Sequence, residues 1–186
     1  INHLYQEELG EIITDDKNIY EELQQLYAGN PDILSKIRFY ENDAISLGTL
    51  YSFETQIQRA ISERVWMKSG AYLIIQPTEA LTVIDVNSGK NTSGKNAEEY
   101  YYKINLEAAA EISRQLRLRN ISGIVIVDFI NMAKEEQRKE LMHQFRLSLK
   151  EDPVPVRLVD ITKLGLVELT RKKERKTLLE QVAQLR

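Results

Sequence analysis

The chain has 186 residues, of which 42% are hydrophobic, a formal net charge of −3 and no cysteine. The lack of cysteine excludes disulfides and thiolate zinc sites within this chain, and the slight negative charge argues against a general nucleic-acid binder. No apolar run approaches the ~18 residues that a membrane span needs. We therefore expect one domain, or one domain with a subdomain, located in the cytoplasm. Because the sequence starts at Ile1 and not at Met, we also expect a fragment of a longer protein.

The first sixty residues predict a short α/β unit. A helical pattern at 18–27 is stopped by Gly-Asn-Pro at 29–31, because these residues break helices. Residues 33–42 suggest a short helix followed by a strand, and 52–65 is helical again. We expect residues 1–60 to form a subdomain of their own.

The rest of the chain predicts strands that alternate with long helices. In order these are two strands within 64–76, a strand at 80–85, a helix at 96–119, a strand at 124–128, a helix at 134–149, strands near 156–161 and 166–170, and a basic C-terminal helix. The strand at 80–85 is almost wholly apolar before its last residue, which indicates a central position in a sheet. The predicted fold class is α/β, with a mixed sheet and flanking helices.

Two aspartates end the two apolar strands of a strand–helix–strand unit. Asp85 ends the strand at 80–85, and Asp128 ends the strand at 124–128. Such a crossover makes its two strands parallel, so both aspartates are expected where open α/β sheets bind ligands. If the strands are neighbours, the two residues lie roughly 5 Å apart at the backbone. Asn87 comes two residues after Asp85 and projects to the same side if the strand continues.

Two carboxylates and one amide oxygen are hard ligands, which suit Mg²⁺. A divalent cation would also remove the repulsion between the two carboxylates. Such an ion can polarise a phosphoryl oxygen and generate hydroxide from water. The alternative is that each aspartate only ends a strand and begins a turn. The sequence pattern leaves both interpretations open.

Residues 89–96 read GKNTSGKN, which resembles a phosphate-binding loop of pattern G-x-x-x-x-G-K-[ST] between a strand and a helix. The last position is Asn96, which has no hydroxyl to offer a metal ion and which also fits a helix cap. A nucleotide hydrolase therefore stays a minor alternative.

Three long segments together resemble one family. They read SGAYLIIQPTEALTVIDVNSGK, NLEAAAEISRQLRLRNISGIVIVDFINM and ITKLGLVELTRKK. They are similar to the catalytic region of the ribonuclease E/G family, closely over 69–173 and more faintly over 1–60. The resemblance implies a DNase I-like catalytic subdomain for 61–186 and part of an RNase H-like subdomain for 1–60.

The resemblance further implies a catalytic-core fragment. The family's RNA-binding OB-fold and its pocket for a 5′-monophosphate would precede this chain, and the zinc link that assembles the subunits would follow it. We therefore expect no zinc in this fragment and a homo-oligomer in the intact protein.

The activity implied by the resemblance is that of a Mg²⁺-dependent endoribonuclease acting in RNA processing and decay. It would cut single-stranded RNA by in-line attack of an activated water, leaving a 5′-phosphate and a 3′-hydroxyl. In this chain the family's metal-holding residues correspond to Asp85 and Asp128, with Mn²⁺ able to substitute for Mg²⁺. Asn87 would help to orient the metal or the scissile phosphate. Asn131 stands where the family often has an acid.

Several basic residues are candidates to hold RNA phosphates. Our primary candidates are Lys90, Arg171 and Lys172, and an ordinary surface charge is an equally good interpretation of each. Residues 152–160 contain fewer bases than the family pattern, and Arg157 and Lys163 could stand in for them.

The competing interpretation from a different class is a folded fragment that binds RNA weakly and does not cut it alone. For Trp66 and most of the tyrosines we predict core or rim positions, not base stacking.

Overall fold

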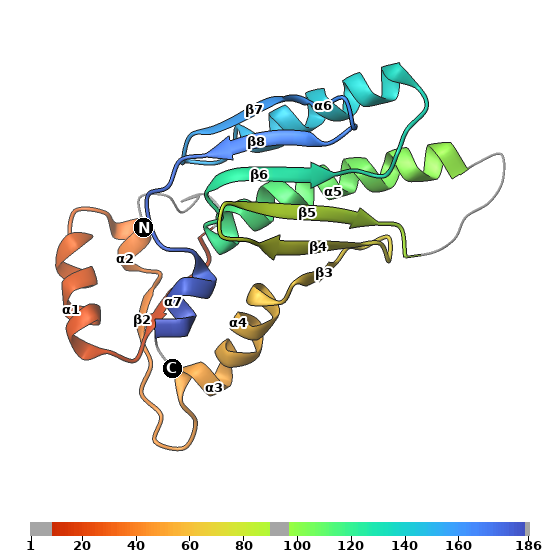
Figure 1. Cartoon of the computed structure of the whole chain (residues 1–186). Coiled ribbons are helices and arrows are strands. Elements are labelled where there is room, and N and C mark those ends of the chain that lie inside the picture. The colour runs from red at the N-terminus through yellow and green to blue at the C-terminus, as the bar shows by residue number, and fades with distance from the viewer. Residues whose placement is uncertain (1–8, 90–96, 185–186) are drawn as a thin grey trace. The chain divides into compact units, whose positions relative to one another are not determined.

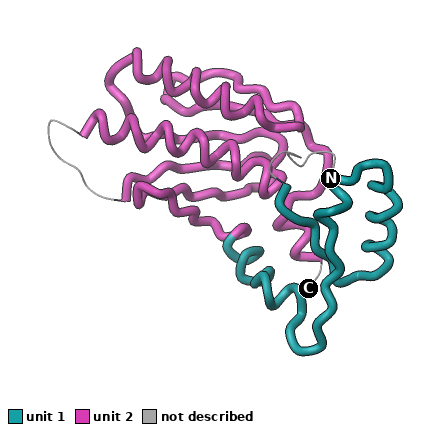
Figure 2. The backbone as a smooth tube through the Cα atoms, turned by 180° about the vertical axis from the view of Figure 1, so that it is seen from behind, with its two compact units in different colours: residues 1–59 teal, residues 60–186 magenta. Residues whose placement is uncertain are grey.

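The computed structural model describes residues 9–89 and 97–184, and the chain divides into two compact units, residues 1–59 and 60–186 (Figure 2). No described helix is both long enough and apolar enough to cross a membrane.

The first unit pairs two short parallel strands with helices. Its elements are β1 (Ile12–Thr14), α1 (Lys17–Leu26), α2 (Pro31–Leu34), β2 (Ile37–Phe39), α3 (Leu47–Leu50) and the start of α4 (Phe53–Ile61). Asp16 begins α1 because its carboxylate accepts hydrogen bonds from the backbone N–H groups of Asn18 and Ile19. Leu23, Ile33 and Ile37 form the small buried cluster of this unit.

The second unit is built on a six-stranded mixed sheet. Its elements are β3 (Arg64–Trp66), β4 (Tyr72–Pro77), β5 (Leu81–Asn87), α5 (Ala97–Arg119), β6 (Gly123–Asp128), α6 (Glu135–Leu149), β7 (Val156–Ile161), β8 (Val167–Arg171) and α7 (Leu178–Gln184). The strand order is β3-β4-β5-β6-β8-β7. Only β5 and β6 pair in parallel, and every other neighbouring pair is antiparallel. The predicted mixed sheet with flanking helices is confirmed, whereas the DNase I-like and RNase H-like assignments stay predictions.

One face of this sheet carries the core of the second unit. The helices α5 and α6 lie against this face (Figure 1). The strand residues that point to it are buried in one cluster with apolar residues of these helices. On the strands they are Leu73, Ile75, Ile84, Val86, Val125, Val127, Val167 and Leu169. The strand residues between them point to the other face, here called the open face. These side chains are more exposed; Ile124, for example, is 49% exposed. Strands with one buried face alternate in this way because successive side chains point to opposite sides.

The basic run at 171–176 is not helical, contrary to the predicted basic C-terminal helix. Arg171 still belongs to β8, and the backbone N–H of Lys172 donates to the carbonyl of Pro155. The helix α7 begins only after a capping box, in which the Thr177 N–H donates to Glu180 and the Glu180 N–H donates to the Thr177 hydroxyl.

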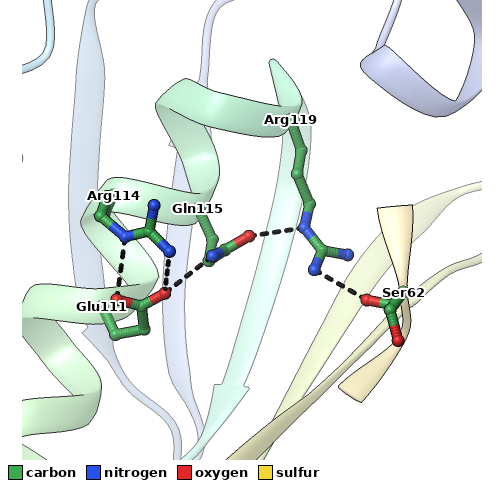
Figure 3. Close-up of polar contacts among 5 residues, drawn as sticks. All are labelled: Ser62, Glu111, Arg114, Gln115 and Arg119. Carbon is green, nitrogen blue, oxygen red and sulfur yellow. Dashed lines mark hydrogen bonds and ion pairs between the residues drawn. The ribbon is translucent and has the colours of Figure 1, made fainter. Parts of the chain in front are cut away.

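A chain of polar contacts ties α5 to the start of β3 (Figure 3). Arg119 is largely buried and donates through Nε to Gln115 Oε1 at 2.6 Å and through Nη2 to the carbonyl of Ser62 at 2.7 Å. Gln115 donates in turn to Glu111 Oε1 at 2.7 Å. Arg114 closes the chain with two hydrogen bonds to the same carboxylate, at 2.7 and 3.0 Å. Buried polar groups of this kind stabilise a fold only when they are paired.

The pKa of Glu111 lies below its ordinary value. Burial alone raises this pKa, but the hydrogen bonds from Arg114 and Gln115, together with the charges of Arg114 and Arg119, lower it by more. A carboxylate whose pKa falls on folding stabilises the fold at pH values above its unfolded pKa, which is about 4.3 for Glu. That contribution is lost as the pH falls through the folded pKa.

We therefore expect Glu111→Gln to lower the free energy of unfolding at neutral pH, and the difference from wild type to shrink as the pH falls below about 4. Urea unfolding at several pH values measures this difference. Glu136→Gln removes an exposed carboxylate on α6 and serves as the matched control. A difference between Glu111→Gln and wild type that stays constant with pH would contradict the expected linkage.

Candidate active site

Two carboxylates lie side by side at the carboxyl ends of β5 and β6. Asp85 and Asp128 are direct partners in the parallel register of these strands, so their backbones are about 5 Å apart. Both are exposed, and the adjacent residues Ile84, Val86 and Val127 point into the core. The two carboxylates therefore share the open face, at what we call the acidic end of the sheet.

Asn87 joins this pair from the last position of β5. Because β5 continues through Asn87, the side chain lies on the open face together with Asp85. Its Nδ2 donates a hydrogen bond to Asp85 Oδ2 at 2.8 Å. This contact fixes the direction of the Asp85 carboxylate.

The donor set fits a small hard cation. Two exposed carboxylates on one face offer the one or two protein carboxylates that Mg²⁺ usually takes, with water and phosphate oxygens completing its octahedron. Within the described residues, no group of three or more His, Cys, Asp or Glu side chains is placed to hold a metal. Among the acidic residues, a site here would thus depend on Asp85 and Asp128.

Asn105, which the sequence analysis did not single out, holds the chain directly after Asp128. It is fully buried on α5, and its Nδ2 donates to the carbonyl of Ile130 at 2.7 Å. Its Oδ1 accepts from the N–H of the same residue at 3.0 Å. The amide therefore pairs both backbone groups of Ile130, as a neighbouring strand would do, in the segment that follows β6. The signal in the sequence is an amide next to Ile104 in the apolar stripe of a long helix.

Gly89 closes the turn that follows Asn87. It has a φ of +70°, and a Cβ at this position would lie 2.5 Å from the carbonyl oxygen of Gly70. A side chain is therefore excluded by both backbone conformation and space. The turn between β3 and β4, which includes Gly70, is itself held by Glu107, whose carboxylate accepts from the N–H of Ser69.

Arg171 does not present its charge to solvent. In its pair with Asp152 the side chains are 3% and 1% exposed, and Nε and Nη2 donate to the carboxylate at 2.8 and 3.2 Å. Nη1 donates to Asn120 Oδ1 and to the carbonyl of Ile121. All three guanidinium nitrogens are thus engaged within the fold, which does not fit the predicted contact with RNA phosphates.

Arg171 and Lys172, two of the three primary candidates for RNA contact, lie away from the acidic end. Arg171 pairs with Gly123 at the start of β6, five residues and roughly 17 Å from Asp128 along the strand. Lys172 follows it, exposed and paired with Glu174 at 3.3 Å. Lys90 lies outside the described residues.

Two other lysines do lie at the acidic end. Lys163 is exposed in the turn between β7 and β8, four residues before Val167, which pairs with Val127. Lys68 is exposed in the turn between β3 and β4, four residues before Tyr72, which pairs with Asn87. Neither has an ion pair among the residues that the structure describes, so both charges are available to a phosphate.

A cavity of about 550 Å³ lies at the opposite end of the sheet. Its walls include Pro77, Leu81, Ile121 and Leu178, with Arg119 among the polar residues. The candidate active site is instead an exposed surface at the acidic end.

We expect Asn105→Ala to lower the free energy of unfolding by about 2–4 kcal/mol, because it leaves two buried backbone groups of Ile130 unpaired. At temperatures at which Asn105→Ala is still folded, its catalytic rate should also be lower than that of the wild type. The reason is that the segment after Asp128 loses the two hydrogen bonds from Asn105. Ser113→Ala is the matched control, since its hydroxyl is buried on the same helix but bonds only within that helix, to Ala109. Equal effects of the two substitutions on rate would refute the positioning role.

The comparisons with known proteins agree on one family. The model described as Ribonuclease E/G family matches residues 1–174. The chain is 39% identical over 171 residues to Ribonuclease G of Salmonella typhimurium (strain SL1344), an alignment that covers 91% of this chain and 35% of the relative. It is 37% identical over 169 residues to Ribonuclease E of Escherichia coli (strain K12), covering 90% of this chain and 16% of the relative.

A further relative, Ribonuclease E of Synechocystis sp. (strain ATCC 27184 / PCC 6803 / Kazusa), is 44% identical over 142 residues, which cover 76% of this chain and 21% of the relative. The chain thus spans 35% of the length of the Ribonuclease G relative and less of the Ribonuclease E relatives. The family match covers most of this chain and includes both strands that carry the acidic pair, and so the chain belongs to the ribonuclease E/G family.

Proposed function

We propose that this chain carries the catalytic carboxylates of a Mg²⁺-dependent endoribonuclease that hydrolyses phosphodiester bonds in single-stranded RNA. The observation that carries the proposal is the direct pairing of Asp85 with Asp128 on the open face. Relatives that bear the name ribonuclease support the reaction class.

Each residue of the acidic end has a part in the proposed reaction. Asp85 and Asp128 hold Mg²⁺, for which Mn²⁺ can substitute, and Asn87 keeps the Asp85 carboxylate in place through its 2.8 Å hydrogen bond. When bound, the cation supplies a Lewis acid for the phosphoryl oxygen and lowers the pKa of water. The proposed products carry a 5′-phosphate and a 3′-hydroxyl.

The substrate backbone would be held by the exposed lysines of the acidic end. Lys163 and Lys68 come from turns on the two sides of the acidic pair in the strand order. One lysine on each side suits an RNA strand that passes across the carboxyl ends of β5 and β6. Contacts with its phosphates would position the RNA without reading its sequence. Arg171 has no part in this proposal.

The same proposal extends to the intact protein only as an inference from its relatives. We propose a cytoplasmic homo-oligomer in which segments outside this chain add affinity for RNA. The competing function is weak RNA binding without cutting by this chain alone, and the experiment below separates the two.

We expect Asp85→Asn and Asp128→Asn each to reduce Mg²⁺-dependent cutting of a fluorescent single-stranded RNA at least ~100-fold, since even the outer-shell partners of metal ligands contribute 10–100-fold. Both variants should remain folded because the two side chains are exposed. Glu174→Gln removes the same charge at the opposite end of the sheet and is the control. Wild-type rates in both aspartate variants would overturn the site, and binding without cutting by the wild-type chain would favour the competing function.

The salt dependence of RNA binding tests the proposed phosphate contacts. Lys163→Ala should weaken binding and reduce the slope of log affinity against log salt by about 0.7, the value for one phosphate contact with a single strand. Lys172→Ala, at the opposite end of the sheet, should leave the slope unchanged. A larger effect of Lys172→Ala than of Lys163→Ala, measured by fluorescence anisotropy, would move the RNA path to the other end.

A further inference from the structure

We propose that the open face of β3 and β4 is a base-stacking subsite, in which Trp66, Tyr72 and Arg64 bind a nucleobase next to the cleaved bond. The inference rests on the proposed function and deepens it, because it identifies where the chain holds a base as well as the phosphate.

The three side chains form one aromatic and cationic cluster. The rings of Trp66 and Tyr72 are 5.0 Å apart between centroids and tilted by 58°. The Arg64 guanidinium carbon lies 4.7 Å from the Tyr72 ring centre and 5.7 Å from that of Trp66. Trp66 is nonetheless 62% exposed, so of the two positions predicted for it, core or rim, the structure agrees with the rim. A large apolar ring held open to solvent in this way is typical of a binding surface.

Strand register places this cluster beside the acidic pair. Trp66 pairs with Tyr72, and Tyr72 pairs with Asn87. Paired residues share one face of a sheet, so Trp66, Tyr72 and Asn87 form one row across the open face.

The neighbouring row contains the acidic pair itself. Arg64 pairs with Ile74, Ile74 with Asp85, and Asp85 with Asp128. Two strand spacings, roughly 10 Å, therefore separate the backbones of Trp66 and Asn87. A nucleotide adjacent to the one held at the acidic end can reach the ring.

The chemistry of the cluster fits a base of a single strand. Every base has a π-face, and stacking on an exposed aromatic ring requires no particular sequence. Unpaired bases also stack on planar guanidinium groups. Arg64 forms no ion pair among the described residues, so its charge can also meet the phosphate that joins the stacked nucleotide to its neighbour. The occupant we propose is thus one base of the substrate strand, not a second protein surface.

Trp66 is the only tryptophan in the chain, so its emission reports on this subsite alone. We would use the Asp128→Asn chain in Mg²⁺, which we expect to bind RNA without cutting it, and titrate it with a short oligoadenylate and with an abasic strand of equal charge. Oligoadenylate should quench the Trp66 emission, and the abasic strand should not. Anisotropy of labelled strands gives the bound fraction independently.

Substitutions test the same subsite without relying on emission. Trp66→Ala should weaken oligoadenylate binding about 5- to 10-fold, the lower part of the range for loss of one stacked base. Trp66→Phe should recover most of that loss because it keeps a π-face. Ile124→Ala, on the open face at the opposite end of β6, is the matched control and should change nothing. In the cutting-competent chain, Trp66→Ala should raise KM far more than it lowers kcat.

The outcomes separate this inference from the proposed function. If the wild-type chain cuts RNA while Trp66 emission responds equally to both strands or to neither, the stacking subsite is overturned and the nuclease stands. Emission that depends on protein concentration and not on RNA would show a second copy of the chain on the ring, which also overturns it. A wild-type chain that neither binds nor cuts RNA removes the proposed function and this inference with it.

Discussion

The parallel register of β5 and β6 is the constraint on which the candidate site depends. Ile84 and Val127 pair directly and are both buried, as are Val86 and Val125 on either side. A slip of either strand by one residue would turn its apolar side chains to the open face and its aspartate into the core, at a cost in burial and in desolvation of a charge. The hydrophobic core thereby fixes the relative position of two acids that are far apart in the sequence. The same alternation sets Asn87, Tyr72 and Trp66 on the face that carries the carboxylates.

The sequence was sufficient for the elements and for the acidic pair because both follow from local patterns. The apolar runs before Asp85 and Asp128 and the long amphipathic helix between them predict a crossover, whose handedness rule makes the strands parallel. The structure has this arrangement, with β5 and β6 as neighbours. An apolar run does not, however, show whether one or both faces of a strand are covered. The predicted central position of the strand at 80–85 is confirmed. The sequence does not show that one face of this strand is exposed.

What the sequence does not show is how side chains contact partners that are distant in sequence. Arg171 belongs to a basic run, and nothing in that run indicates that Asp152 would bury its guanidinium across a strand and a turn. Asn105 holds Ile130, 25 residues later, a contact that only the packing of α5 against the sheet creates. Trp66 lies on a strand whose burial pattern is too short, at three residues, to reveal which face is covered. In each case the sequence shows the type of residue, and only the tertiary fold shows what its side chain contacts.

The two ends of the sheet use polar groups in opposite ways, and this division bears on function. At the opposite end Arg171 and Arg119 donate hydrogen bonds to acceptors within the protein. These contacts stabilise the fold, and the N–H groups that make them are not free to bind a ligand. At the acidic end Asp128, Arg64, Lys163 and Lys68 lack ion pairs within the described part of the chain. Unpaired charges of both signs on an exposed face add little to the stability of the fold. Their arrangement is better explained by a negatively charged ligand, which the lysines and Arg64 would attract directly and the carboxylates would bind through a cation. Apart from Gly89, the glycine-rich stretch behind the nucleotide-hydrolase interpretation lies outside the described residues, so that interpretation stays a minor prediction. The phosphodiester strand that we propose across the acidic end would use each of these charged groups.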